Sequence, residues 1–67
     1  IRVNCVSPGG VFNGHNDQFV KAYSDRVPMG RMAKREELVG IILYLLSDSS
    51  SYVTGQNFII DGGLTTW

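Results

Sequence analysis

A proline followed by two glycines, Pro8-Gly9-Gly10, is the stretch of this 67-residue chain best suited to hold a ligand. The residues before it, Ile1 to Val6, are mostly apolar and predict a short β-strand. Because proline lacks an N–H and fixes φ, we expect the strand not to continue as a central ladder past Ser7. The glycines let the backbone turn sharply and let another molecule come close to it. In a parallel α/β sheet, ligands bind beyond the carboxyl ends of the strands, where this loop would lie.

Few other side chains in the sequence offer chemistry. His15, the only histidine, could donate a hydrogen bond to a substrate, but it has no second ligand nearby and predicts no metal site. Asn4 either braces the turn that follows its strand or is a solvated strand-edge residue. Cys5 is expected to be a small buried hydrophobe. A loose basic cluster is either a solvated face or a place where one cation meets an anion: Arg26, Arg31, Lys34 and Arg35.

Composition places the chain among ordinary globular proteins. It is 43% hydrophobic and 18% charged, with equal numbers of acids and bases. Zero formal net charge gives no electrostatic argument for nucleic acid or an anionic membrane surface as a partner. The longest apolar run, residues 38–46, is too short to span a bilayer. A single cysteine fits a reducing compartment, so the sequence predicts a cytoplasmic protein.

The length of the chain limits the core that it can bury. Ordering costs about 1.5 kcal/mol per residue, or on the order of 100 kcal/mol in all. A chain this short, without a disulfide or an evident metal site, is marginal on its own. It also begins at Ile1, inside an expected strand and without a methionine. We therefore expect it to be part of a larger domain.

Residues 13–34 predict a mobile excursion that carries a short helix. Asn16 or Asp17 can cap this helix, and Pro28 should end it near Val27. One apolar stripe runs along it: Phe19, Val20, Tyr23 and Val27. A short amphipathic helix over a strand-end crevice suits a substrate lid. An ordinary surface helix would show the same stripe, so both readings stay open.

The second half of the sequence predicts a long helix and a second strand. The helix begins at Glu36-Glu37, where carboxylates favour the positive end of the dipole. Residues 38–46 are apolar almost all round, so we expect burial against a sheet and against a further element or subunit. Residues 56–60 predict the second strand, ended by Asp61-Gly62-Gly63. Strands separated by helices should be parallel, which gives an α/β unit of strand, lid helix, long helix and strand.

Four motifs, in order across essentially all 67 residues, resemble the short-chain dehydrogenase/reductase family. They are Ile1-Arg2-Val3-Asn4-x-Val6-x-Pro8-Gly9-x-Val11, Pro28-Met29-Gly30-Arg31 followed by Glu36-Glu37, Tyr52-Val53-Thr54-Gly55-Gln56, and Ile60-Asp61-Gly62-Gly63. Any one of them is weak, and four in register make the resemblance strong. It implies that residues 1–67 are the C-terminal part of one Rossmann-like domain, incomplete without the chain that precedes it.

The resemblance also implies a cofactor and an activity. The family binds NAD or NADP and moves a hydride between nicotinamide and a carbonyl or alcohol. Carried over to this chain, Pro8 and Gly9 would border the nicotinamide ring, and the backbone of Val11 would bond its carboxamide. Asn13 stands where the family usually has a threonine that contacts the carboxamide or pyrophosphate. It keeps donor and acceptor capacity, so we expect it to contact the cofactor.

The residues that the family uses for catalysis are absent from this sequence. Its glycine-rich phosphate loop, its serine and its Tyr-x-x-x-Lys motif have no counterpart, since no lysine follows Tyr23, Tyr44 or Tyr52 by four positions. We expect no catalytic residue in this chain and no activity from it alone. The expected partners are the preceding part of the domain, a small carbonyl or alcohol substrate, and further copies in a dimer or tetramer. The tail, residues 64–67, is expected either to pack into that oligomer interface or a neighbouring subunit's site, or to be disordered. The alternative to an enzyme is a non-catalytic structural or interaction module.

Overall fold

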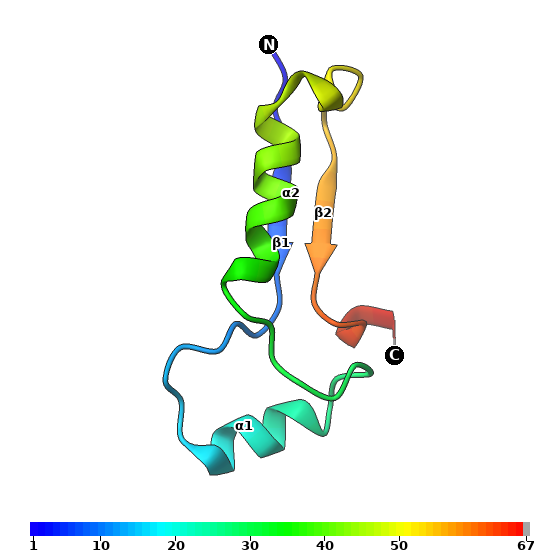
Figure 1. Cartoon of the computed structure of the whole chain (residues 1–67). Helices are drawn as coiled ribbons and strands as arrows, with labels where there is room; N and C mark the ends of the chain where they lie inside the picture. Colours follow the sequence, from blue (N-terminus) through cyan, green and yellow to red (C-terminus); the bar gives the residue numbers. More distant parts are fainter. Residues whose placement is uncertain (67) are drawn as a thin grey trace.

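The structure, a computed structural model, describes residues 1–66. Along the chain it forms β1 (Cys5–Pro8), α1 (Asp17–Ser24), α2 (Glu36–Leu46) and β2 (Asn57–Ile60). Short 3₁₀ turns cover Asp48–Ser50 and Leu64–Thr66. Trp67, the last residue of the tail for which an interface or disorder was predicted, lies outside the described residues. β1 and β2 pair in parallel, α2 runs beside them in the opposite direction, and α1 lies beyond their carboxyl ends (Figure 1). The predicted parallel α/β arrangement is confirmed.

The proline belongs to β1, contrary to the prediction. Pro8 is the last residue of the strand and pairs with Ile60. The N–H of Cys5 donates to the carbonyl of Gln56, just before β2, at 2.8 Å, and the N–H of Gly9 donates to that of Ile60 at 2.9 Å. Successive residues of a strand face opposite edges, so the nitrogen of Pro8 faces away from β2, where its missing N–H breaks no bond of this ladder. β1 also starts four residues later than expected, because Ile1 to Asn4 make no strand ladder.

Asn4 nevertheless joins the N-terminal segment to the turn that precedes β2. Its Nδ2 donates to the carbonyl of Val53 and its Oδ1 accepts from the N–H of Gln56, both at 3.0 Å. The half-buried side chain therefore braces the turn before β2. It does not brace the turn after its own strand, as one of the two predictions had it. Arg2 ties the same region to the end of α2: its guanidinium donates to the carbonyls of Ser50 (2.8 Å) and Leu45 (3.3 Å).

Helix α1 is shorter than predicted but is capped as expected. The Asn16 side chain accepts a hydrogen bond from the N–H of Phe19 at 2.8 Å, which satisfies one free donor of the first turn. The helix ends at Ser24, three residues before Val27. The N–H of Val27 bonds the carbonyl of Ser24, so a tighter turn replaces the last helical turn before Pro28.

Little of the apolar surface is buried within residues 1–66. Val27 and Met32 are the buried hydrophobic side chains, at 4% and 7% exposure. Cys5 is exposed, so its predicted burial is wrong for this chain, and no side chain of α2 is buried. The predicted two-sided burial of α2 is not seen either. Its half-buried side chains lie at helical spacing along one face: Leu38, Ile41 and Leu45.

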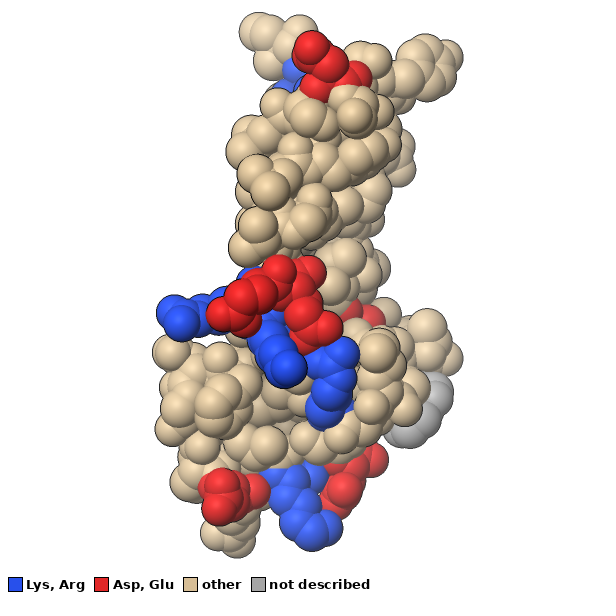
Figure 2. All heavy atoms as spheres, in the orientation of Figure 1, with Lys and Arg blue, Asp and Glu red and all other residues tan. Residues whose placement is uncertain are grey.

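The outer face of α2 has no cover from the described residues. Four large aliphatic side chains are exposed there: Val39, Ile42, Leu43 and Leu46. Charged side chains gather instead at the N-terminal end of α2 and around α1, and the surface over most of α2 carries none (Figure 2). Within the described residues only the two-stranded sheet lies beside this helix. The further element or subunit predicted to cover its other side is therefore not seen. None of the helices within residues 1–66 is long and apolar enough to cross a membrane.

Candidate functional site

The loop that follows β1 leaves one backbone donor and one acceptor unused. Ala33 forms an isolated parallel bridge with Val11: its N–H bonds the carbonyl of Gly10 (2.9 Å) and its carbonyl accepts from Phe12 (2.8 Å). In such a bridge, the N–H and C=O of the opposing residue, Val11, point to the other side. No hydrogen bond joins either group to another residue within 1–66. A half-buried residue at a strand end therefore presents a free donor and a free acceptor.

The two glycines of the loop are required by close neighbours within the chain. Neither Gly9 nor Gly10 has a positive φ, so the sharp turn predicted from glycine conformations does not occur there. A Cβ on Gly9 would lie 2.8 Å from Cβ of Asp61, and a Cβ on Gly10 would lie 2.6 Å from Cε1 of Tyr23. The predicted close approach is present, but the atoms that approach belong to this chain.

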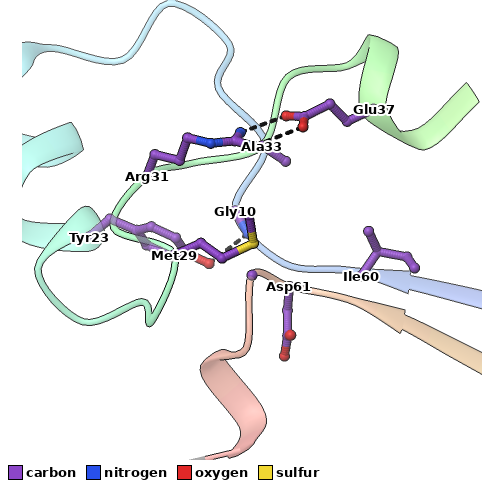
Figure 3. A pocket seen from close by; sticks show the side chains of 9 residues that line it. Gly10, Tyr23, Met29, Arg31, Ala33, Glu37, Ile60 and Asp61 are labelled. Carbon is purple, nitrogen blue, oxygen red and sulfur yellow. Dashed lines mark hydrogen bonds and ion pairs between the residues drawn. The ribbon is translucent and has the colours of Figure 1, made fainter.

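Tyr23 connects α1 to the loop. The N–H of Gly10 donates to its hydroxyl oxygen at 2.6 Å, and the half-buried ring lies against Gly10 (Figure 3). Sequence reasoning missed this contact, because it placed Tyr23 only on the apolar stripe of the helix. The one available signal was the second glycine after Pro8, which marks a backbone position that something bulky approaches.

A small cavity of about 90 Å³ lies between these elements. The loop lines it through Gly10, α1 through Tyr23, and the end of β2 through Asp61, while the side chain of Met29 lies across it (Figure 3). Since one water occupies about 30 Å³ of liquid, the cavity has room for a few waters and is too small for a dinucleotide. The cavity between the loop, α1 and the end of β2 therefore does not hold a large ligand by itself.

An ion pair closes one end of this cavity. The Arg31 guanidinium donates to both carboxylate oxygens of Glu37, at 2.7 and 2.9 Å, and the N–H of Lys34 donates to the same carboxylate at 2.9 Å. The hydrogen bonds from Arg31, followed by the one from Lys34, lower the pKa of Glu37 to about 2. Arg31 is thus engaged within the chain, and it fastens the segment before α2 to that helix.

We expect Glu37→Gln to destabilise the complete protein at neutral pH, by an amount that shrinks in acid. The pKa of Glu37 is depressed in the folded state, so its stabilising effect is present above the ordinary pKa of 4.5 and is lost as pH falls towards about 2. Thermal unfolding at several pH values between 7 and 3 measures the difference from wild type. Glu36→Gln is the control, and a Glu37→Gln deficit that does not change with pH would contradict this role.

Asn13 and His15 lie away from the cavity. Asn13 is exposed, its N–H bonds Nδ1 of His15 at 3.3 Å, and it lines a separate groove of about 250 Å³ together with Lys34 and Arg35. The ring of His15 stacks on Phe19, with centroids 4.8 Å apart. No cluster of His, Cys, Asp or Glu suited to a metal ion occurs in the described part of the chain. The structure thus does not bring Asn13 into the cavity of Gly10.

Comparison with known proteins identifies the family. The family model described as enoyl-(acyl carrier protein) reductase matches residues 1–65. A short-chain dehydrogenase from Leptospira borgpetersenii, solved with bound NAD⁺, superposes with a TM-score of 0.88 and 50% identity over 96% of this chain. The chain belongs to the short-chain dehydrogenase/reductase family. The resemblance carried by its four sequence motifs is therefore confirmed, and NAD(P) binding and the Rossmann fold are properties of that family.

Relatives with assigned activities are dehydrogenases and reductases. D-arabinitol 2-dehydrogenase (ribulose-forming) of Candida tropicalis is 46% identical over 76 residues, which cover all of this chain and 27% of that protein. The 3-oxoacyl-[acyl-carrier-protein] reductase FabG of Thermotoga maritima is 46% identical over 68 residues, covering 96% of this chain and 28% of that protein. The chain thus spans about a quarter of the length of the short-chain dehydrogenases/reductases that it matches, and 25% of the Leptospira structure.

Proposed function

We propose that residues 1–67 are the C-terminal segment of one NAD(P)-binding Rossmann-like domain in an oxidoreductase. The complete protein would transfer a hydride between the nicotinamide of NAD or NADP and a carbonyl or alcohol carbon. The observation that carries the proposal is the free N–H and C=O of Val11 at the carboxyl end of β1. A primary carboxamide has one acceptor and two donors, so it complements this pair of groups. Ligands of parallel α/β sheets bind at that end of the strands.

Residues on both sides of Gly10 have roles in this proposal. Pro8 and Gly9 border one face of the nicotinamide ring, and Val11 holds the carboxamide through its backbone. When bound, the cofactor supplies or accepts the hydride. A wall on one face of the ring leaves the other face to the substrate, which would fix the stereochemistry of transfer. Asn13 contacts the carboxamide or the pyrophosphate, and its groove is lined by two cations, Lys34 and Arg35, and one carboxylate, Glu36, which leaves an excess of positive charge for a phosphate.

The remaining elements have supporting roles. Residues 13–34 act as a substrate lid, which is supported by the position of α1 beyond the carboxyl ends of the strands (Figure 1). The exposed aliphatic face of α2 packs against the preceding part of the domain or against a second copy of the chain. The second arrangement gives a homo-oligomer. The general acid, its lysine and the phosphate loop lie outside this chain.

A hydride-transfer assay of the complete protein tests the proposal. Purified protein is mixed with NADH or NADPH and with ketoses or 3-oxoacyl thioesters, and the absorbance of the reduced nicotinamide is followed. We expect consumption of one dinucleotide with at least one carbonyl class, and the reverse reaction with the matching alcohol. Binding of neither dinucleotide, together with no turnover, would contradict the proposal and favour a non-catalytic module.

A further inference from the structure

We propose that Tyr23 is a positioning residue for the nicotinamide, acting through the backbone of Gly10. The inference rests on the proposed function, and it concerns a residue of α1 that the cofactor itself does not need to touch. Its basis is the hydrogen bond from the N–H of Gly10 to the Tyr23 hydroxyl, at 2.6 Å. That distance lies just below the usual range of about 2.7–3.2 Å for a donor nitrogen and an acceptor oxygen, and the half-buried ring shields the bond from solvent.

The backbone of Gly10 is held from both sides. Tyr23 binds the N–H of Gly10, and the N–H of Ala33 binds its carbonyl at 2.9 Å. The carbonyl of Gly10 and the N–H of Val11 belong to one planar peptide unit and point in opposite directions. The hydrogen bond from Ala33 holds the Gly10–Val11 peptide unit, and the bond to Tyr23 holds the Gly9–Gly10 peptide unit before it. Together they fix the direction of the free N–H of Val11. A preorganised donor binds more tightly, because less freedom is lost when the ligand arrives.

The same bond joins the proposed lid to the cofactor-side loop. Tyr23 ends a row of rings along α1, in which the Phe19 ring lies 6.4 Å from it and the His15 ring 4.8 Å from Phe19. The far end of this row also contacts the loop, because the His15 ring lies 6.1 Å from the Phe12 ring and its Nδ1 accepts from the N–H of Asn13. A change in the seating of α1 would therefore reach Gly10 through the Tyr23 hydroxyl, so that lid position and cofactor binding are coupled.

Ordinary packing of the Tyr23 ring would also explain part of this arrangement. The two roles separate in a Tyr23→Phe variant, which keeps the ring against Gly10 and removes the acceptor oxygen. If the ring alone matters, the variant behaves as wild type. If the hydroxyl orients the loop, the variant loses affinity for ligands that carry nicotinamide and keeps its affinity for those that do not.

The experiment measures the affinity of the complete protein for NADH or NADPH and for ADP-ribose or its 2′-phosphate, which lack the nicotinamide. In Tyr23→Phe we expect about fivefold weaker binding of the reduced dinucleotide, because one hydrogen bond that orients the loop is lost. Binding of ADP-ribose or its 2′-phosphate should be unchanged. Amide hydrogen exchange without ligand should be faster at Gly10 than in wild type. Tyr52→Phe removes an exposed hydroxyl and is the matched control.

The outcomes distinguish this inference from the proposed function. Equal affinity of Tyr23→Phe and wild type for the dinucleotide, or equal weakening for dinucleotide and fragment, overturns the positioning role. Unchanged exchange at Gly10 overturns the contact itself. Failure of the wild-type protein to bind either dinucleotide overturns the proposed function and this inference with it, while the exchange result still reports on the contact between Tyr23 and Gly10.

Discussion

A Gly10→Ala variant of the complete protein will unfold at a lower temperature and bind the nicotinamide dinucleotide less tightly than wild type. The added Cβ would lie 2.6 Å from Cε1 and 2.7 Å from Oη of Tyr23, closer than such contacts allow. Either the ring or the loop must then move. Overpacking of this kind costs about 1–3 kcal/mol of stability. Displacement of the loop also turns the free donor of Val11 away from its direction in wild type.

Removal of the ring tests the cause of this loss. In a Tyr23→Ala background, the Cβ on Gly10 has no ring to meet, so the additional loss from Gly10→Ala should nearly disappear. The two effects are then strongly non-additive, as expected for residues in direct contact. Thermal unfolding and dinucleotide titration of the two single variants and the double variant complete the cycle. Effects that add within error would show that Gly10 is needed for a reason other than Tyr23.

Val11→Pro is expected to weaken binding of the nicotinamide dinucleotide by more than tenfold. Proline removes the N–H that we propose to bond the carboxamide, and a polar group left unpaired in a site costs about 1–3 kcal/mol. The substitution breaks no hydrogen bond among residues 1–66, because Val11 donates to none of them. The bonds of Ala33 to Gly10 and Phe12 use other groups, so the bridge can remain.

The affinity measurements for Val11→Pro need two comparisons. Val11→Ala keeps the N–H and shortens the side chain, so it should bind the dinucleotide within about threefold of wild type if the backbone makes the contact. ADP-ribose should bind Val11→Pro as well as it binds wild type. A Val11→Pro variant with wild-type affinity for the dinucleotide would remove Val11 from the site.

Much of the local structure follows from residues near in sequence. Asn16 caps α1 because its side chain reaches the N–H of a residue three positions on, and Glu36 begins α2 as predicted from its charge. The parallel pairing follows from the helices between the strands. The loop after β1 could be singled out from Pro8 and two glycines alone, and the family resemblance supplied its ligand.

Contacts between distant residues could not be predicted in this way. Whether Pro8 interrupts a ladder depends on which edge its nitrogen faces, and the sequence does not specify that register. Tyr23 meets Gly10 only because of how α1 docks, whereas its apolar stripe shows merely that one face is packed. The salt bridge of Arg31 with Glu37 likewise needs the turn between them. The free groups of Val11 became visible only once its bridge to Ala33 was known.

A crystal structure of the complete protein with its nicotinamide dinucleotide would show whether Val11 holds the carboxamide. We expect the carboxamide to lie about 3 Å from both the nitrogen and the carbonyl oxygen of Val11, with Pro8 and Gly9 beside the ring. We also expect the N–H of Gly10 still to donate to Tyr23. A nicotinamide ring bound elsewhere, with the N–H of Val11 bonded to another part of the protein, would exclude Val11 from the cofactor site.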